Sequence, residues 1–557
     1  MSRRAWRLFL ALAILELVAL GVVWRIRSVD EIDPQLNGPV ELASAECEAR
    51  PLPTRNYQPS TPDDHRDLAG GENLGLPGHR VIALYPDSVA TFVSGTETAR
   101  FQRVESGSFD LQEVTNLVDD PDWLAEVEPG LFEAGAGIFQ QPGSELEITQ
   151  PGVRELRLLD QPGVMLFARG GKVTVDGVRI TSWDSALEAF DPDPLDGRPF
   201  MLFQDGSDAL IENSEIIGLG SDRGLSYGLT FRGYTTTGVL RNSKLSWNYF
   251  GLFTWEADGT VIEGNLFELN DVYGIDPHDR SRNLVIRDNI SRCNGRHGII
   301  ISEDVISTEI TNNETYANRL NGVMVDKRSH GAVVANNYSW GNLGDGIVVA
   351  SSADVAVHDN RSYGNRVGIR LSQVGTEEIT LTDNDVRTNR IGLEAAAEVK
   401  AIQLQGNQWL DNTQLGLLLA SDGVTSIGDL VNGSDRAVDV RGDVELSAGT
   451  FRAESDGIVV RAGELTIEGS QVQAGEFGVR NDGSNNIEVR SSSIEASRAL
   501  VGAAVIDSQT TTSDQFRLDD VVRLILIAGA VLTASVVLAD VHRVTKGRAA
   551  LGRGHRT

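Results

Sequence analysis

Short apolar runs separated by Asn and Gly recur through the middle of this chain. An Asn returns every 23 or 24 residues, a second Asn follows five residues later, and a Gly comes three or four residues after that. A β-branched run such as Ile299-Ile300-Ile301 then begins. The first asparagines of the repeats are Asn265, Asn289, Asn313, Asn337, Asn360, Asn384 and Asn407.

This period predicts a solenoid in which each repeat forms one coil. The fixed leucine frame of leucine-rich repeats is absent, and no stretch has helical periodicity long enough for one helix per repeat. The pattern therefore predicts an all-β parallel β-helix whose coils stack at about 4.8 Å. Asn accepts left-handed backbone and pairs with its copy one coil away, so we interpret the repeated asparagines as structural. Weaker alternation extends the β-helix over residues 145–506.

Both ends of the chain carry apolar segments with basic flanks. Residues 1–27 are predicted to form an N-terminal transmembrane anchor, with a cleaved signal peptide as the alternative, and residues 523–541 a C-terminal transmembrane helix. Basic flanks mark the cytoplasmic side, so both termini, including the basic tail 542–557, are expected in the cytoplasm. The β-helix would then lie outside the cytoplasm at the cell membrane. Residues 28–144 are predicted to be a linker and small capping region, and residues 507–522 a second linker.

The formal charge of −30 excludes a nucleic-acid partner, because phosphate binding needs a basic face. The two cysteines, Cys47 and Cys293, lie in different regions and indicate no disulfide framework. Cys293 falls at a repeat position that other coils fill with small residues, so we expect it to be buried. No cluster has the spacing of metal ligands, and we expect neither a metal nor a cofactor.

One coil departs from the apolar pattern. Asp276 stands where the following coils have Ile300 and Met324, and Pro277 follows it. A charge at a core-like position costs several kcal/mol unless it is paired, and proline removes a donor from a strand. Such departures mark functional sites. His278 lies between Asp276 and Asp279 and has a pKa near neutrality, which favours general acid/base chemistry.

We therefore select His278, Tyr273, Asp276 and Asp279 as candidate catalytic residues. Two other histidines, His297 and His330, are expected at the surface or at corners. The candidate substrate-binding residues are Arg280, Arg282, Arg296, Glu303, Lys327, Glu256 and Tyr227.

The segment "YGIDPHDRS" (273–281) resembles the signature of periplasmic mannuronan C5-epimerases. "HGIIIS" (297–302), "FGLFTWEA" (250–257), "SYGLTF" (226–231) and "GRPFMLFQDG" (197–206) are similar to neighbouring coils of that family. The resemblance covers about residues 170–360 and implies a right-handed parallel β-helix. It also implies that His278 removes the C5 proton of a uronate within a polymer, with Asp276 and Asp279 beside it. Tyr273 or a water would then return a proton to the opposite face.

The family has an Arg directly after the "HGIIIS" run, where this chain has Glu303. Removing a proton next to a carboxylate builds further negative charge, which something cationic must stabilise. Glu256, Asp279 and Glu303 are also expected to fall in one column, where they would repel each other. Either Lys327, Arg280, Arg282 or Arg296 supplies the cation, or a protonated Glu303 shares its proton, or the substrate is not polymannuronate.

The expected function is thus a membrane-anchored, extracytoplasmic polysaccharide-modifying isomerase of the C5-epimerase type. Its expected partners are an anionic or related exopolysaccharide and a polysaccharide synthase or export complex. The alternatives are a lyase, which shares the proton abstraction, a hydrolase that uses Asp279 and Glu303, and a non-catalytic glycan-binding or assembly scaffold.

Overall fold

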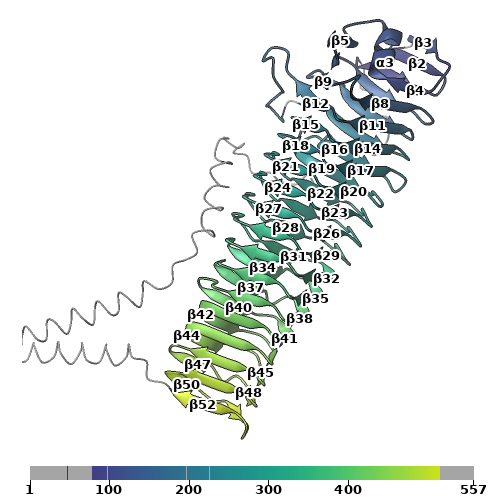
Figure 1. Ribbon diagram of the computed structural model, residues 1–557. Helices are drawn as coiled ribbons and strands as arrows, with labels where there is room; N and C mark the ends of the chain where they lie inside the picture. The colour runs from purple at the N-terminus through teal and green to yellow at the C-terminus, as the bar shows by residue number, and fades with distance from the viewer. Residues whose placement is uncertain (1–46, 48–77, 97, 196, 225, 515–557) are drawn as a thin grey trace, which may run out of the picture.

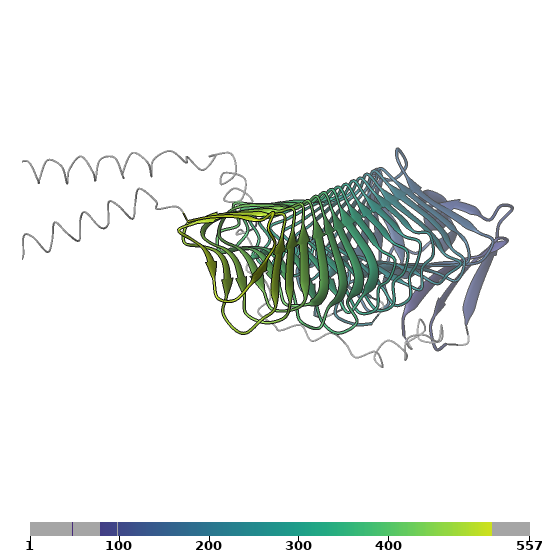
Figure 2. The same ribbon diagram turned by 90° about the horizontal axis from the view of Figure 1, so that it is seen from below.

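The computed structural model describes residues 47, 78–96, 98–195, 197–224 and 226–514. They form a long solenoid with an N-terminal cap at one end (Figure 1). Viewed from below, the coils stack along one axis from the purple cap to the yellow C-terminal coils (Figure 2). Coils in the middle of the solenoid have three short strands each. The predicted parallel β-helix is therefore confirmed.

The first strands of successive coils form the outer face that carries the candidate site residues Asp276 and His278. In chain order they are β7 (Gly137–Gln140), β10 (Met165–Arg169), β13 (Phe200–Gln204), β16 (Gly228–Arg232), β19 (Phe250–Trp255), β22 (Ile275–His278), β25 (Ile299–Ile301), β28 (Val323–Val325), β31 (Ile347–Ala350), β34 (Val367–Ser372), β37 (Ile391–Ala395) and β40 (Leu415–Leu419). Each pairs in parallel with the strand one coil away. We call the outward side of β13 to β28 the His278 face.

Two further stacks of strands close each coil. One contains β14 (Asp208–Glu212), β17 (Thr237–Arg241), β20 (Val261–Glu263), β23 (Val285–Arg287), β26 (Glu309–Thr311), β29 (Val333–Ala335) and β32 (Ala353–His358). The other contains β15 (Glu215–Ile217), β18 (Lys244–Ser246), β21 (Leu266–Glu268), β24 (Ile290–Arg292), β27 (Glu314–Tyr316), β30 (Tyr338–Trp340), β33 (Arg361–Tyr363), β36 (Asp385–Arg387) and β39 (Gln408–Leu410). Long strands such as β42 (Leu430–Val440) and β44 (Thr450–Val460) continue the solenoid to β52 (Thr511–Asp514).

The solenoid interior is apolar and is bordered by ladders of buried asparagines. The amide of Asn294 donates to Oδ1 of Asn318 at 3.0 Å and accepts from the amide of Asn270 at 2.9 Å. A parallel ladder links Asn265 to Asn289, also at 3.0 Å, and continues coil by coil. Each amide thereby satisfies buried donors and acceptors at a corner, which confirms that the repeated asparagines are structural.

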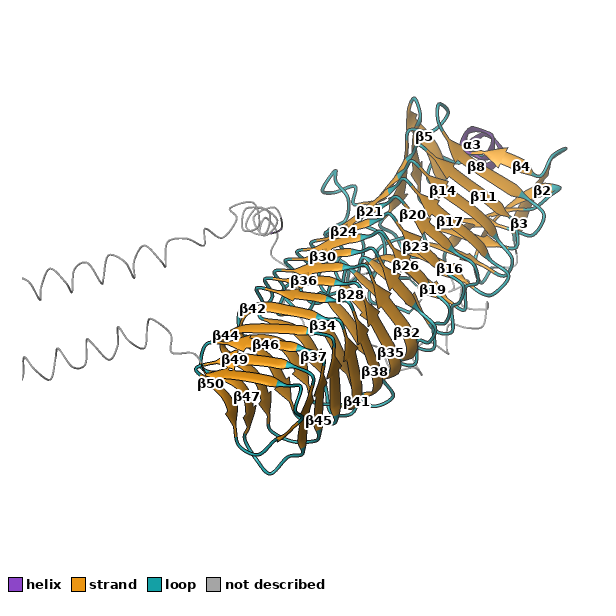
Figure 3. Cartoon of the chain, turned by 60° about the horizontal axis from the view of Figure 1, so that its bottom comes forward, coloured by secondary structure: helices purple, strands orange, loops and turns teal. Residues whose placement is uncertain are grey.

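The N-terminal cap contains the strands β1 (Arg80–Leu84), β2 (Ser88–Val93) and β3 (Ala99–Arg103), which pair antiparallel. The helix α3 (Leu111–Val118) follows, and its N-cap Asp110 accepts from the backbone N–H of Glu113. Figure 3 shows this helix in purple beside the strands and loops of the first coils. Parallel pairing already begins here, because β1 also pairs with β7.

The transmembrane part of the predicted fold class is corrected. Over the residues that the structure describes, no helix is long and apolar enough to span a membrane. The helix α3 has only eight residues. The segments on which the prediction rested, residues 1–27 and 523–541, lie outside the described residues, as does the tail 542–557. The fold class supported by the structure is the β-helix with its cap.

The absence of a disulfide was also predicted wrongly. Cys47 and Cys293 form a disulfide across a sequence separation of 246 residues, with their Cα atoms 5.4 Å apart. Cys293 lies at the corner after β24, in the coil that begins with Tyr273. Cys47 lies outside the repeat, so no spacing pattern pointed to its partner.

Candidate active site

The strand β22 places Asp276 and His278 on the His278 face. Side chains alternate along a strand, and Ile275 belongs to the apolar interior. Asp276 and His278 pair in register with Phe253 and Trp255, which belong to a separate aromatic cluster. His278 therefore points away from the interior. We call the residues at one position in successive coils a column, and His278 follows Trp255 directly in its column.

His278 forms a hydrogen-bonded pair with the next residue. Its Nδ1 lies 2.7 Å from Oδ2 of Asp279, and its side chain is 19% exposed. Burial alone would lower the pKa of His278, but the bond to Asp279 and the charges of Asp276, Asp279 and Glu303 outweigh it and raise the pKa. In the neutral ring Nδ1 donates to Asp279, which leaves Nε2 as the atom that can accept a proton.

The backbone at the corner after His278 allows the His278–Asp279 pair to form. Trp255 is in register with His278, whereas Asp258 is bridged to Arg282, so the His278 coil has one additional residue at this corner. Asp279 and Arg280 both adopt left-handed backbone, with φ of 44° and 60°. Asp tolerates this conformation better than most residues.

Asp276 is a buried acid with a raised pKa. It is 2% exposed, and its Oδ1 has no hydrogen-bond partner. Burial, together with the charge of Asp279, raises the pKa of Asp276 to about 7, against the opposing charges of His278, Lys327 and Arg296. Near neutral pH this carboxyl is therefore partly protonated, which reduces the negative charge beside His278.

The Asp276→Asn variant is expected to become relatively more stable as the pH rises. The folded state holds a proton on Asp276 up to about pH 7, whereas an unfolded Asp loses it near pH 4, so stability is lost through this window. The amide does not titrate. The free energy of unfolding of the variant, relative to the parent, should therefore increase by roughly 2–4 kcal/mol between pH 4.5 and pH 8. Urea denaturation at several pH values measures it, with the exposed Asp208→Asn as control.

The aromatic surroundings of His278 are closely packed. The Tyr273 ring stacks on the His297 ring at 5.5 Å and lies 5.1 Å from Phe250. The guanidinium of Arg296 lies 5.5 Å from the centre of the Tyr273 ring. Tyr227 is 2% exposed and stacks on Phe250 at 4.8 Å. The structure thus places Tyr273 beside the candidate site, and Tyr227 inside the adjoining cluster, two coils upstream.

The three carboxylates expected to repel each other all have partners. Glu303 accepts from Nζ of Lys327 at 2.6 Å, and Asp279 contacts His278. Glu256 pairs with Arg280, also at 2.6 Å. Arg282 pairs with Asp258 at 2.9 Å. Of the cations considered from the sequence, Arg280 and Arg282 are therefore directed at carboxylates of the preceding coil.

Two buried side chains of this region were not selected as site residues from the sequence. His297 lies at the corner between β24 and β25, one of the two expected places, but it is buried, and burial together with Arg296 lowers its pKa to about 3, so its ring is neutral. Asp326 is 8% exposed, and its Oδ1 has no hydrogen-bond partner. Burial raises the pKa of Asp326. Asp326 follows His278 and Ser302 in their column, and like Asp276 it is an acid directly beside an apolar strand run, which is the signal in the sequence that points to it. The exposed His330 is as expected.

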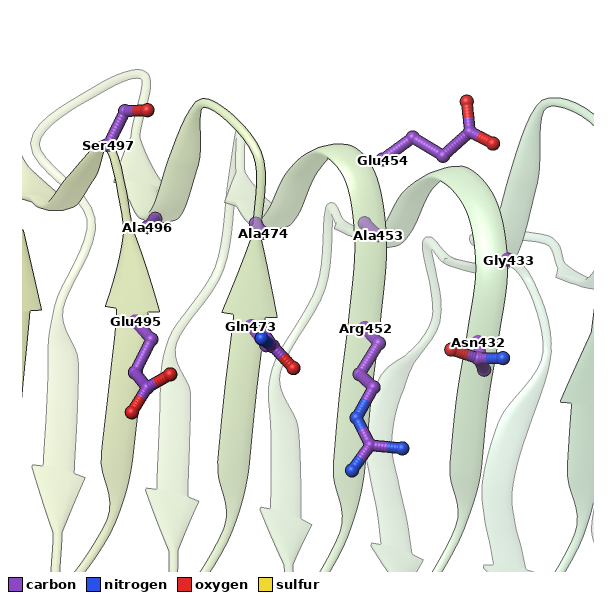
Figure 4. A pocket seen from close by; sticks show the side chains of 10 residues that line it. All are labelled: Asn432, Gly433, Arg452, Ala453, Glu454, Gln473, Ala474, Glu495, Ala496 and Ser497. Carbon is purple, nitrogen blue, oxygen red and sulfur yellow. The ribbon is translucent and has the colours of Figure 1, made fainter. Parts of the chain in front are cut away.

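A separate pocket of about 290 Å³ lies on the C-terminal coils, away from His278. Figure 4 shows Arg452, Gln473 and Glu495 on neighbouring strands along it, beside small corner residues. No histidine lines it. We take the His278 face as the candidate site, because His278 is paired with Asp279 there and lies on the same strand as the buried Asp276.

The fold is a right-handed parallel β-helix, and one outer face carries the candidate site around His278. Family models agree: "Right handed beta helix region" matches residues 162–337, and "Periplasmic copper-binding protein (NosD)" matches residues 303–425.

The resemblance to mannuronan C5-epimerases is confirmed by direct comparison. The chain is 34% identical to the mannuronan C5-epimerase of Pseudomonas fluorescens over 199 residues, which are 33% of this chain and 37% of that protein. It is 34% identical to that of Pseudomonas aeruginosa over 179 residues, 30% of this chain and 33% of the relative. The match thus spans about a third of the relatives' length. Among solved structures, the periplasmic alginate epimerase AlgG is similar at 23% identity and a TM-score of 0.48, over 74% of this chain and 85% of its own.

Proposed function

We propose that this chain is an extracytoplasmic polysaccharide-modifying enzyme that epimerises uronate residues at C5 within a polymer. The observation that carries the proposal is the outward-facing His278, paired through Nδ1 with Asp279 and flanked by the buried Asp276. These residues belong to the segment 273–281 that resembles the signature of mannuronan C5-epimerases, and the chain is 34% identical to one such enzyme over 199 residues. A polyuronate such as polymannuronate is accordingly the proposed substrate.

In the proposed reaction Nε2 of His278 accepts the C5 proton, and the electrons of the broken C–H bond pass towards the sugar carboxylate. Asp279 holds the ring in the required tautomer and stabilises the imidazolium that forms. A proton from Tyr273 or from water then forms a new bond to C5 on the opposite face. The stereochemistry inverts, and no bond between sugars breaks.

The sugar carboxylate needs a cation while the charge develops. We assign this role to Lys327, which Glu303 holds by a 2.6 Å bond and which remains 42% exposed. The charge of Lys327 also acts on Asp276, as does that of Arg296. Glu303 would then position a cation from the next coil, in place of the Arg found after "HGIIIS" in the family.

The proposed compartment lies outside the cytoplasm. The disulfide between Cys47 and Cys293 suits an oxidising environment. One similar solved protein is described as a periplasmic epimerase, and one matching family as periplasmic. Association with a polysaccharide synthase or export complex follows as a further hypothesis, which co-purification from the cell envelope tests.

Incubation of the full chain with polymannuronate tests the reaction class. The expected result is the appearance of guluronate signals in the proton NMR spectrum, with chain length unchanged. Unsaturated ends that absorb in the ultraviolet would instead identify a lyase, and new reducing ends without unsaturation a hydrolase. An unchanged polymer would contradict the proposal.

The pH profile provides a test of the base. Because His278 must be unprotonated to accept the proton, the rate should rise with pH through its raised pKa. Asp279→Asn removes the charge and the bond that raise this pKa, so the acid limb of the profile should move to lower pH by about one unit. The maximal rate should also fall, because the base becomes weaker. An acid limb that does not move would contradict the assignment of His278.

A further inference from the structure

An arginine on the His278 face has no function in the reaction described so far. Arg232 ends β16, and its register partner one coil on is Trp255, whose own partner is His278. The three residues therefore follow each other along one column, on strands that are adjacent in Figure 1. Two coil spacings separate Arg232 from His278, which is roughly 10 Å.

Buried neighbours hold the guanidinium of Arg232 in place. Its Nη1 donates to Oε1 of Gln204 at 3.1 Å, and its Cζ lies 5.1 Å from the centre of the Trp255 ring. Gln204 and Trp255 are 4% and 6% exposed. One hydrogen bond uses one of the five N–H donors that a guanidinium carries.

Arg232 also has no ion-pair partner among the described residues. The two acids whose charges act on it are Asp205 and Glu256. Asp205 pairs with Arg169 at 3.0 Å, and Glu256 pairs with Arg280 at 2.6 Å. Partial burial of a charged guanidinium costs free energy when no carboxylate is paired with it, and a carboxylate of a bound ligand would remove this cost. Other arginines of nearby coils, such as Arg241 with Glu212, are paired.

We propose that Arg232 binds the carboxylate of a uronate two units away from the sugar that reacts at His278. This subsite rests on the proposed function and deepens it. A pyranose unit of an extended 1,4-linked chain advances by about the spacing of one coil, so a polymer lying along the solenoid presents its second neighbouring carboxylate at Arg232. Guanidinium and carboxylate match in two parallel hydrogen bonds. The subsite selects polyuronates over neutral glycans and longer chains over short ones.

The test measures binding separately from turnover. In the full chain carrying His278→Ala, the affinity for oligomannuronates of two to eight units is measured by calorimetry, with and without Arg232→Gln. The His278→Ala protein that retains Arg232, which is the parent in this comparison, should gain affinity when the oligomer becomes long enough to reach Arg232. Arg232→Gln should remove this gain and weaken binding of the longer oligomers by about tenfold or more. Short oligomers should bind both proteins equally.

Two controls isolate the carboxylate contact. Arg241→Gln removes an arginine of the same coil that is paired with Glu212 on another face, and should leave all affinities unchanged. Carboxyl-reduced oligomers, which are neutral, should bind the parent and Arg232→Gln alike. The subsite is overturned if Arg232→Gln binds every uronate oligomer as tightly as the parent, if it loses affinity equally for the neutral oligomers, or if the parent binds no uronate oligomer. Failure of the epimerase proposal is seen separately, as wild-type protein that binds these oligomers without converting them.

Discussion

Replacing His278 with glutamine should lower the rate of C5 epimerisation by about 10²–10⁴-fold. Glutamine keeps a polar side chain of similar length but has no atom that accepts a proton from carbon near neutral pH. The rate of guluronate formation measures the loss. Retention of more than about a tenth of the parent rate would contradict the role of His278.

His358 offers a matched control for this variant. Its Nδ1 lies 2.8 Å from Oδ2 of Asp359. This pair has the same two residue types in the same order as His278 and Asp279, at nearly the same distance. However, His358 ends β32, on another face of the solenoid, and its side chain is 37% exposed. His358→Gln should therefore leave the rate unchanged. Equal losses in the two variants would show that the effect is not specific to the His278 face.

Replacing Asn294 with alanine should lower the free energy of unfolding by roughly 3–5 kcal/mol. The Asn294 Oδ1 accepts from both the backbone N–H and the amide of Asn270, at 3.2 and 2.9 Å. Alanine leaves the buried backbone N–H of Asn270 without an acceptor, removes one of the two acceptors of the Asn270 amide, and breaks the link to Asn318. Because Asn294 lies in the coil that begins with Tyr273, the damage should also reduce activity.

Urea denaturation followed by circular dichroism measures this loss of stability. Gln408→Ala is the control, since it removes an exposed amide directly after the ladder residue Asn407. Its effect should stay within about 0.5 kcal/mol. Equal stability of Asn294→Ala and the parent would show that the ladder does not hold the coils together.

The coil architecture was predictable because every coil requires the same residue types at the same positions. An Asn that pairs with its own copy must return at every coil, so its spacing predicts the stacking, and the interior follows from the apolar runs. The disulfide was not predictable in the same way, because Cys47 lies outside the repeat. The additional residue at the corner after His278 was also missed, since counting at a constant interval hides it.

The candidate site was predictable where a residue type contradicted its position. Asp276 in an apolar column drew attention to His278, and the outward direction of both agrees with the alternation of β22. Lys327 was one of four cations that the sequence left open, and its bond to Glu303 is visible only in the structure. Arg232 and His297 were missed because their importance depends on burial and on neighbours from other coils, which a linear pattern does not contain.

The incorporation of solvent deuterium tests the central claim most directly. If His278 removes a proton from C5 and a new proton arrives from the opposite face, polymannuronate treated in deuterated water should carry deuterium at C5 of each newly formed guluronate. Inverted residues that retain the original hydrogen, or a polymer with neither inversion nor deuterium, would contradict proton abstraction by this site.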